Sequence, residues 1–271
     1  MAVRLYGLIT GRLLVAVLHG VGLFLLLKSK SDIPNQRLLL INLAIVEMFT
    51  GFFGALKLVL MITGYFSARI RLVERFIGTL LYTRIRFAVL HIIMDRFLEI
   101  YLNLRYPLYM NIAKMKILSV CLWVIGIIFA TINTILMYSK GMNMTRKFFE
   151  FTLVTFDIII VVTAISTYVF YYLKAKRARR SENQQNLNRI RKKFILPCYL
   201  VTTYILFNFT SMLLLAISQN IEGEEKVQLM FLAAGTLDIL AYLSDAFVYI
   251  FMNKKVFQLL QIACIRSDNR T

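Results

Sequence analysis

The sequence has few of the residues on which catalytic and disulfide-stabilised domains depend. It contains three cysteines, three prolines, two histidines and one tryptophan in 271 residues. Three cysteines cannot build a disulfide framework, and none has the spacing of a metal-binding motif. The two histidines, His19 and His91, are too few and too far apart to suggest a catalytic or metal-ligating group. We therefore expect no enzymatic activity, no cofactor and no metal site.

Acidic residues are also scarce. Lys and Arg number 32 against 14 Asp and Glu, which gives a formal net charge of +18. Such a charge can indicate nucleic-acid binding. Here, however, 59% of the residues are hydrophobic, which is more than the roughly half that is usual in soluble domains. We therefore predict contact between the basic residues and membrane lipid headgroups, and no nucleic-acid binding.

Long apolar runs occupy most of the chain, and strand-like alternation is absent. A helix needs roughly 20 mostly apolar residues to cross a bilayer. The sequence therefore predicts an all-α membrane protein, a single seven-transmembrane helix bundle with no room for a second domain. The seven predicted spans are about 8–27, 38–62, 72–100, 117–138, 148–173, 194–218 and 227–252.

A short amphipathic juxtamembrane helix is predicted after the seventh span, over about 254–265. Lys254 and Lys255 precede apolar residues at 256, 259, 260 and 263, which have helical spacing. Such a helix lies in the membrane interface. Cys264 is a candidate for palmitoylation, and a buried free thiol is the alternative.

The basic residues are divided unequally between the two sides of the predicted bundle. One side holds 19 Lys and Arg and the other holds 9. Nine of the 19 lie in the segment 174–193, which suits lipid headgroups or a cytoplasmic partner. Because the cytoplasmic side is the more basic, we predict a multi-pass plasma-membrane protein with the N-terminus outside and the C-terminus cytoplasmic. Asn143 begins a glycosylation sequon in a segment that this orientation places outside.

Several short motifs lie at fixed places in this seven-span pattern. The second span contains Ile41–Glu47, the third ends with Asp95-Arg96-Phe97, the fourth contains Trp123, and the seventh ends with Asp245–Tyr249. In order and placement they resemble the LNLAxAD, DRY, Trp and NPxxY motifs of rhodopsin-like (class A) G-protein-coupled receptors. The resemblance extends over nearly the whole chain.

The resemblance implies an extracellular ligand and a heterotrimeric G protein at the cytoplasmic face. It assigns Asp95, Arg96, Tyr168 and Tyr249 to the activation switch. Arg96 would pair with Asp95 at rest and turn into the bundle when the sixth span moves, where Tyr168 and Tyr249 would support it. The alternative is an arginine that extends to the interface and forms a local salt bridge.

The chain also departs from the family pattern. Arg71 replaces the cysteine of the outer disulfide, the sixth-span box Phe207–Thr210 lacks Trp and Pro, and Ala246 replaces the seventh-span Pro. Gly78 stands where amine receptors of the family have Asp, and Ile239 stands where opsins have the retinal Lys. The resemblance therefore excludes a retinal chromophore and disfavours a biogenic amine, and the ligand is otherwise unknown.

Charged residues inside the spans usually pair or have a function. The resemblance puts Glu47 and Asp245 beside the site where the family binds sodium, and two close carboxylates need a compensating cation. We predict that Arg86 supplies it through a salt bridge to Glu47 and Asp245. The alternative is that Arg86 meets only a backbone carbonyl or water. The other intramembrane charges are Lys57, Arg84, Asp157 and Asp238.

Two other functions stay open at this point. A seven-span transporter or channel would use the intramembrane charges along a translocation path, although no internal repeat of the kind common in transporters is evident. A receptor-like protein that does not signal would act as a partner or a decoy.

Overall fold

The computed structural model describes residues 2–28, 34–65, 67–102, 105–140, 142–180, 198–218, 224–248 and 250. Most of these residues are helical, and no strand occurs among them. Seven helices are long and apolar enough to cross a membrane. The protein is therefore an all-α bundle with seven candidate membrane spans, as predicted. The predicted interfacial helix at 254–265 lies outside the described residues.

In chain order, the bounds of the helices are α1 Ala2–Lys28, α2 Pro34–Ile62, α3 Ala68–Leu102, α4 Tyr106–Tyr109, α5 Ile112–Lys140, α6 Met142–Arg180, η2 Tyr204–Phe209, α8 Thr210–Ser218 and α9 Glu224–Phe247. The apolar spans within them are Leu5–Lys28, Asn35–Ile62, Ala68–Leu102, Ile112–Ser139, Phe151–Lys176, Cys198–Leu215 and Lys226–Phe247.

Local sequence explains where several elements begin and end. Pro34 is the first residue of α2, where no backbone N–H is needed, and Gly64 adopts a positive φ of 74° in the turn between α2 and α3. Among the described residues, no proline lies inside a span. The sixth span instead contains the π-helical turn η2, which overlaps the box at Phe207–Thr210. Such turns interrupt α-helices only briefly and are frequent at functional sites.

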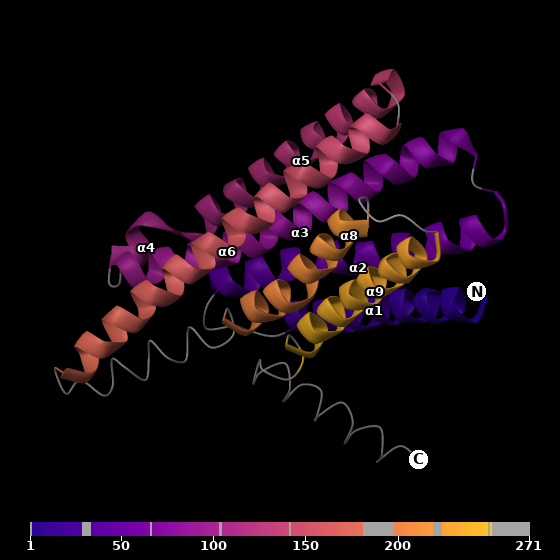
Figure 1. The fold of residues 1–271 in the computed structure, drawn as a ribbon. Coiled ribbons are helices and arrows are strands. Elements are labelled where there is room, and N and C mark those ends of the chain that lie inside the picture. Colours follow the sequence, from indigo (N-terminus) through magenta and orange to yellow (C-terminus); the bar gives the residue numbers. More distant parts are fainter. Residues whose placement is uncertain are drawn as a thin grey trace, which may run out of the picture.

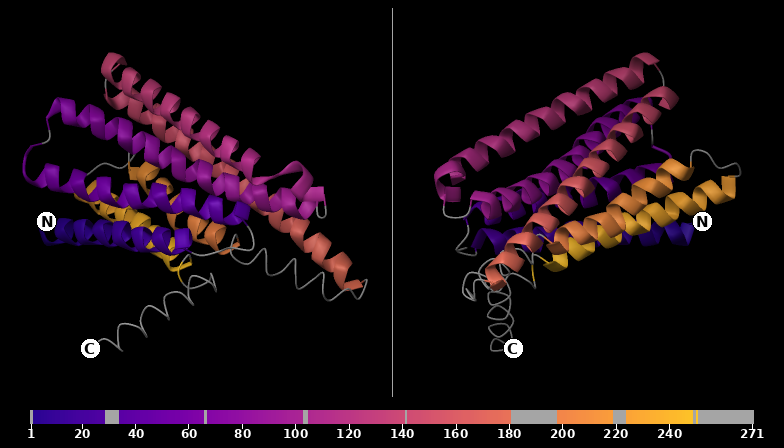
Figure 2. Two further views of the ribbon diagram at one scale, coloured as in Figure 1. Left: turned by 180° about the vertical axis from the view of Figure 1, so that it is seen from behind. Right: turned by 60° about the vertical axis from the view of Figure 1, so that its left-hand side comes forward.

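Helix α3 lies at the centre of the bundle. Of its most apolar window, 67% of the residues are buried, against at most 33% in any other span. It packs against α2, α5 and α6, while α1 contacts both α2 and α9 and so closes the ring. Figures 1 and 2 show the N-terminus at the same end of the bundle as the α2–α3 turn and the α5–α6 junction. We call this the N-terminal end.

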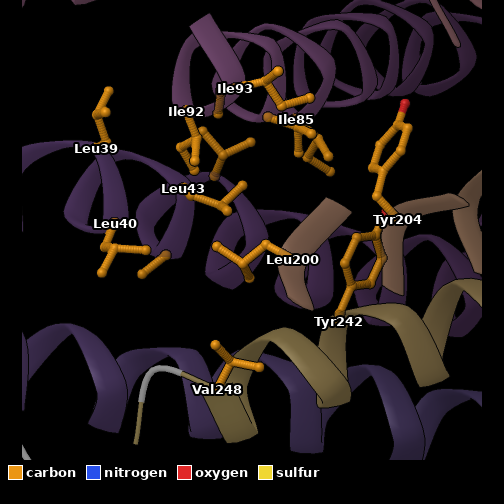
Figure 3. Packing of buried hydrophobic residues seen from close by; sticks show 14 of the residues in the cluster. Leu39, Leu40, Leu43, Ile85, Ile92, Ile93, Leu200, Tyr204, Tyr242 and Val248 are labelled. Carbon is orange, nitrogen blue, oxygen red and sulfur yellow. The ribbon is translucent and has the colours of Figure 1, made fainter. Parts of the chain in front are cut away.

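The apolar core joins the central helices. Leucines of α2 and isoleucines of α3 meet side chains from the sixth span and from α9 (Figure 3). Large apolar side chains also cover the outer surface: Ile117, Ile135 and Val162 are 63%, 60% and 57% exposed. Lipid tails are as apolar as these side chains, so this surface suits a bilayer.

Candidate functional site

Arg86 on α3 forms a buried ion pair with Asp157 on α6. Arg86 Nε lies 2.8 Å from Asp157 Oδ1, and Nη2 lies 2.9 Å from Oδ2. The third nitrogen, Nη1, donates to the backbone carbonyl of Tyr82 at 3.1 Å, and the Tyr204 hydroxyl donates to Asp157. Arg86 is 3% exposed and Asp157 is fully buried. The two-point contact joins α3 to α6, and the Tyr204 hydroxyl joins η2 to the same pair.

The predicted salt bridge from Arg86 to Glu47 and Asp245 is therefore wrong, because Asp157 is the acid that Arg86 meets. The reason is the face of α3 on which Arg86 lies. Ile85 is in the apolar core with leucines of α2, the helix that carries Glu47 (Figure 3). Arg86 is one residue later, about 100° further round the helix, and so it faces α6.

Glu47 and Asp245 are nevertheless neighbours. Their carboxyl groups lie close enough to interact, and Asp245 accepts a hydrogen bond from Thr203 Oγ1 at 2.8 Å. His19 Nδ1 lies 3.2 Å from Glu47 Oε2, and its Nε2 lies 2.8 Å from the carbonyl oxygen of Tyr242.

A second buried ion pair, between α1 and α9, was not predicted. Arg12 Nη2 lies 3.3 Å from Asp238 Oδ2, and the Tyr82 hydroxyl lies 3.5 Å from the same oxygen. Arg12 and Asp238 are 8% and 7% exposed. The signal in the sequence was a cation, Arg12, in the first apolar run and an acid, Asp238, in the seventh, since charges at membrane depth usually pair.

Arg84 differs from both of these arginines. It is fully buried, yet none of the described acidic residues forms an ion pair with it. Its Nη2 donates to Asn42 Oδ1 at 3.3 Å, and its guanidinium carbon lies 4.4 Å from the centre of the Trp123 ring. Trp123 Nε1 donates to the same Asn42 oxygen at 3.0 Å. Asn42 and Trp123 thus link α2 to α5 across α3.

Asp95 and Arg96 lie at the end of α3 opposite the N-terminal end, and the predicted local pair between them is present. Arg96, which is 2% exposed, also donates from Nη1 to Glu99 Oε2 at 2.5 Å. The Tyr106 hydroxyl of α4 donates to Asp95 and accepts from Asn35 Nδ2 at 3.1 Å. Burial, together with the Asp95 carboxylate, raises the pKa of Tyr106, so its hydroxyl keeps the proton that it donates.

The remaining predicted site residues are placed less fully. Tyr168 is 55% exposed on α6, with its ring centre 6.5 Å from that of Tyr171. Asn143 lies in the first turn of α6, and its side chain is outside the described part of the structure. Tyr249 and Cys264 are outside the described residues. The switch roles of Tyr168 and Tyr249 therefore stay predictions.

A cavity of about 1150 Å³ lies between α1, α2, α3 and α9, towards the N-terminal end. Its walls are mainly apolar and include Leu8, Phe53, Ile77, Leu81 and Leu232. The polar residues that line it are Arg12, Thr50, Lys57, Glu74, Tyr82, Lys226 and Gln228. This volume is slightly above the range of about 300–1,000 Å³ typical of small-molecule sites. It is therefore a candidate ligand site.

The two ends of this cavity follow from the direction of its helices. Arg12, Thr50 and Tyr82 are the lining residues of α1, α2 and α3 furthest from the N-terminal end, and they form the floor. Lys57 lies nearer the mouth and pairs with Glu74, with 2.6 Å between Nζ and Oε1. Lys57 thus has an acidic partner at the cavity wall.

No group of three or more His, Cys, Asp or Glu side chains in the described part of the protein is arranged to hold a metal ion. No protein-family model matches the chain, and no curated protein matches its sequence. Functional inference therefore depends on the geometry itself. An apolar cavity lies towards one end of α3, and Arg96, which is buried and paired with two acids, lies at the other end.

Proposed function

We propose that the chain is a divergent member of the rhodopsin-like G-protein-coupled receptors. It binds an extracellular ligand and transmits the signal to a heterotrimeric G protein. It lies in the plasma membrane with its N-terminus outside and its C-terminus in the cytoplasm. The basic residues concentrated on the predicted cytoplasmic side support this orientation.

The observation that carries the proposal is the position of Arg96 relative to the cavity. Tyr82 at the cavity floor and Arg96 are both on α3, the most buried helix. They are 14 residues apart in sequence, which is about 21 Å along an α-helix. A ligand at one end can bias the bundle between two states, and a partner at the other end can read the state.

Arg96 is held in a way that suits such a switch. It is buried and contacts both Asp95 and Glu99, and Tyr106 holds Asp95 from the following short helix. A partner that needs the guanidinium can reach it only after the bundle rearranges. Switching proteins commonly use such exchange of contacts between two discrete arrangements.

The sixth span offers a place for that rearrangement. Receptors of the family have a proline in this span, and here Thr210 stands at that position, directly after the turn η2, Tyr204–Phe209. A π-helical turn breaks the regular hydrogen-bond ladder of a helix. Tyr204 within it donates to Asp157, so a movement of this turn acts directly on the Arg86–Asp157 pair.

Contacts between distant motif residues support the resemblance. Asn42 and Trp123 belong to the second-span and fourth-span motifs and share a hydrogen bond. Glu47 and Asp245 belong to the second-span and seventh-span motifs and are neighbours. These contacts bring together motif residues that are far apart in sequence, which supports the resemblance.

The test is nucleotide exchange on a purified heterotrimeric G protein, with the chain reconstituted in membranes and with tissue extract added or left out. Wild type is expected to accelerate exchange, and Arg96→Ala is expected to abolish or greatly reduce it without loss of surface expression. Arg105→Ala, at an exposed arginine of the same end, is the matched control and should behave as wild type. Equal exchange by Arg96→Ala would contradict the proposal, and ion flux without exchange would favour a transporter.

A further inference from the structure

At the floor of the cavity between α1, α2, α3 and α9, the hydrogen-bond donors open to a ligand are those of Arg12. Arg12 has donors only. The Thr50 hydroxyl already donates to the carbonyl of Val46 at 2.8 Å, and Tyr82 faces Asp238. Asp238 itself is not among the lining residues, so at the floor the cation borders the cavity and its acid lies behind. The floor therefore suits a ligand group that accepts hydrogen bonds.

Arg12 has guanidinium N–H donors that its acid partner does not use, unlike Arg86. Arg86 meets Asp157 at two points, 2.8 and 2.9 Å apart, whereas Arg12 meets Asp238 at one point, 3.3 Å apart. Both side chains are buried in the bundle, so the difference is one of geometry. The Arg12–Asp238 pair leaves Nε and Nη1 unused by the acid.

A glycine makes room for Arg12 beside the cavity. A Cβ atom at Gly54 would lie 3.1 Å from Arg12 Cδ and 3.3 Å from its Nε. Gly54 also lines the cavity, so the arginine lies along a wall that has no side chain at this point. The planar fork of arginine binds a carboxylate at two points, which lysine cannot do.

The charge of the lining also favours an anion. The described lining residues include three cations, Arg12, Lys57 and Lys226, and one acid, Glu74. When Asp238 behind the floor is counted, one positive charge remains. The surplus charge is that of Lys226, which is exposed at the start of α9, and an exposed cation near the mouth attracts an anion towards the cavity.

The cavity also reaches the lipid-facing surface of the bundle. Leu56, Met61 and Leu229 line it, and they are 41%, 52% and 61% exposed. A ligand with a long apolar part can therefore approach from the bilayer and keep that part out of water. Apolar walls contribute roughly 25 cal/mol for each Å² of apolar surface that they remove from water.

We infer that this cavity binds an amphipathic carboxylate of the long-chain fatty-acid type. The acyl chain lies along the apolar walls, and the carboxylate accepts hydrogen bonds from Arg12 at the floor. As the ligand class of the receptor, this inference rests on the proposed function. As a binding site, it rests only on the cavity and on Arg12.

The test uses the full chain in phosphatidylcholine nanodiscs and dansylaminoundecanoic acid as the fluorescent probe, with empty nanodiscs as background. Saturable binding above this background is expected. Dodecanoic acid should displace the probe at about one tenth or less of the concentration that dodecanol or dodecylamine needs, as one charge-assisted hydrogen bond would provide. Equal displacement by the alcohol, or stronger displacement by the amine, would overturn the inference.

Two kinds of variant locate the site. The double variant Arg12→Gln with Asp238→Asn removes both charges and strands neither partner, and it should lose the preference for acid over alcohol. Gly78→Phe places a ring in the cavity, since a Cβ there would meet only Glu74 Oε1, at 3.7 Å, and it should lose saturable binding. Gly7→Phe is the matched control, because Gly7 has nothing within 4 Å and does not line the cavity.

A second blocking variant keeps the test decisive if Gly78→Phe folds poorly. Gly235→Phe fills the cavity from α9, where a Cβ would meet only Leu8, at 3.7 and 4.0 Å. Wild-type binding by a well-folded Gly78→Phe or Gly235→Phe variant, or acid preference retained by the double variant, would overturn the inference. Probe binding without nucleotide exchange would contradict the receptor function but support this binding site. Nucleotide exchange without probe binding would support the receptor function but contradict this binding site.

Discussion

Replacing Arg86 by leucine tests the central ion pair of the bundle. The substitution leaves Asp157, which is fully buried, without its cation and with the Tyr204 hydroxyl as its remaining side-chain contact. Removing one partner of a buried pair typically costs about 3–5 kcal/mol. At about 2–4 °C per kcal/mol for a chain of roughly this size, the midpoint of thermal unfolding should fall by about 6–20 °C.

Arg84→Leu is the matched control. The same substitution two residues earlier removes a fully buried arginine, but no carboxylate of the described chain is stranded. The variant loses the contact with Trp123, worth about 0.5–2 kcal/mol. It also removes the cost of burying an unpaired charge. We expect a midpoint close to that of wild type.

The acid partner is tested by double variants. Arg86→Leu combined with Asp157→Leu removes both charges and should recover most of the lost stability, because paired apolar replacements of buried ions are often neutral. Arg86→Leu combined with Glu47→Leu tests the pairing first predicted and should recover none. The assay heats detergent-solubilised protein and measures the folded fraction by size-exclusion chromatography. An Asp157 double variant no better than the single one, or an equal fall for Arg84→Leu, would refute the reasoning.

Two further predictions concern helix packing and orientation. Gly51→Ala should cost about 1–3 kcal/mol in the same assay, because its Cβ would lie 2.7 Å from the carbonyl oxygen of Arg12 in α1. Gly7→Ala, with nothing within 4 Å, should cost little, and equal losses would contradict this explanation. Protease added to intact cells should spare the segment 174–193, and glycosidase should shift wild type but not Asn143→Gln. Cleavage of 174–193 from outside would reverse the orientation.

The seven spans could be predicted because crossing a bilayer is a local requirement. About 20 consecutive apolar residues satisfy it whatever the rest of the chain does. The ends were less predictable. The third span was expected over 72–100, and α3 covers Ala68–Leu102, because a helix continues through charged residues such as Arg69 and Arg71 once its ends leave the lipid.

The local part of the Arg96 site was predictable for a similar reason. Asp95 and Arg96 are adjacent in sequence, so their pair depends on a single helix end. The hydroxyl of Tyr106 reaches Asp95 only because the chain folds back through α4. Nothing in the spacing of the two residues shows where α4 lies, so this contact needed the structure.

The partners of the intramembrane charges could not be predicted from the sequence. Hydropathy shows that Arg86 lies inside a span but not the direction in which that side of the helix faces. A change of one residue rotates the side chain by about 100°, which is enough to exchange one neighbouring helix for another. The role of Arg12 was not predicted for a related reason. Arg12 lies near the end of its span, and a charged residue there is easily assigned to the segment outside the membrane.

The intramembrane charges determine which helices are neighbours, which apolar residues in a membrane cannot do. Lipid tails solvate leucine as well as another helix does, so apolar burial alone does not decide which helices are neighbours. The pairs Arg12–Asp238 and Arg86–Asp157 join α1 to α9 and α3 to α6, so each links the first half of the chain to the second. A rotated or exchanged helix would strand a charge in the bilayer, at a cost of several kcal/mol. Two such pairs therefore select the observed helix arrangement over alternatives with equally apolar contacts.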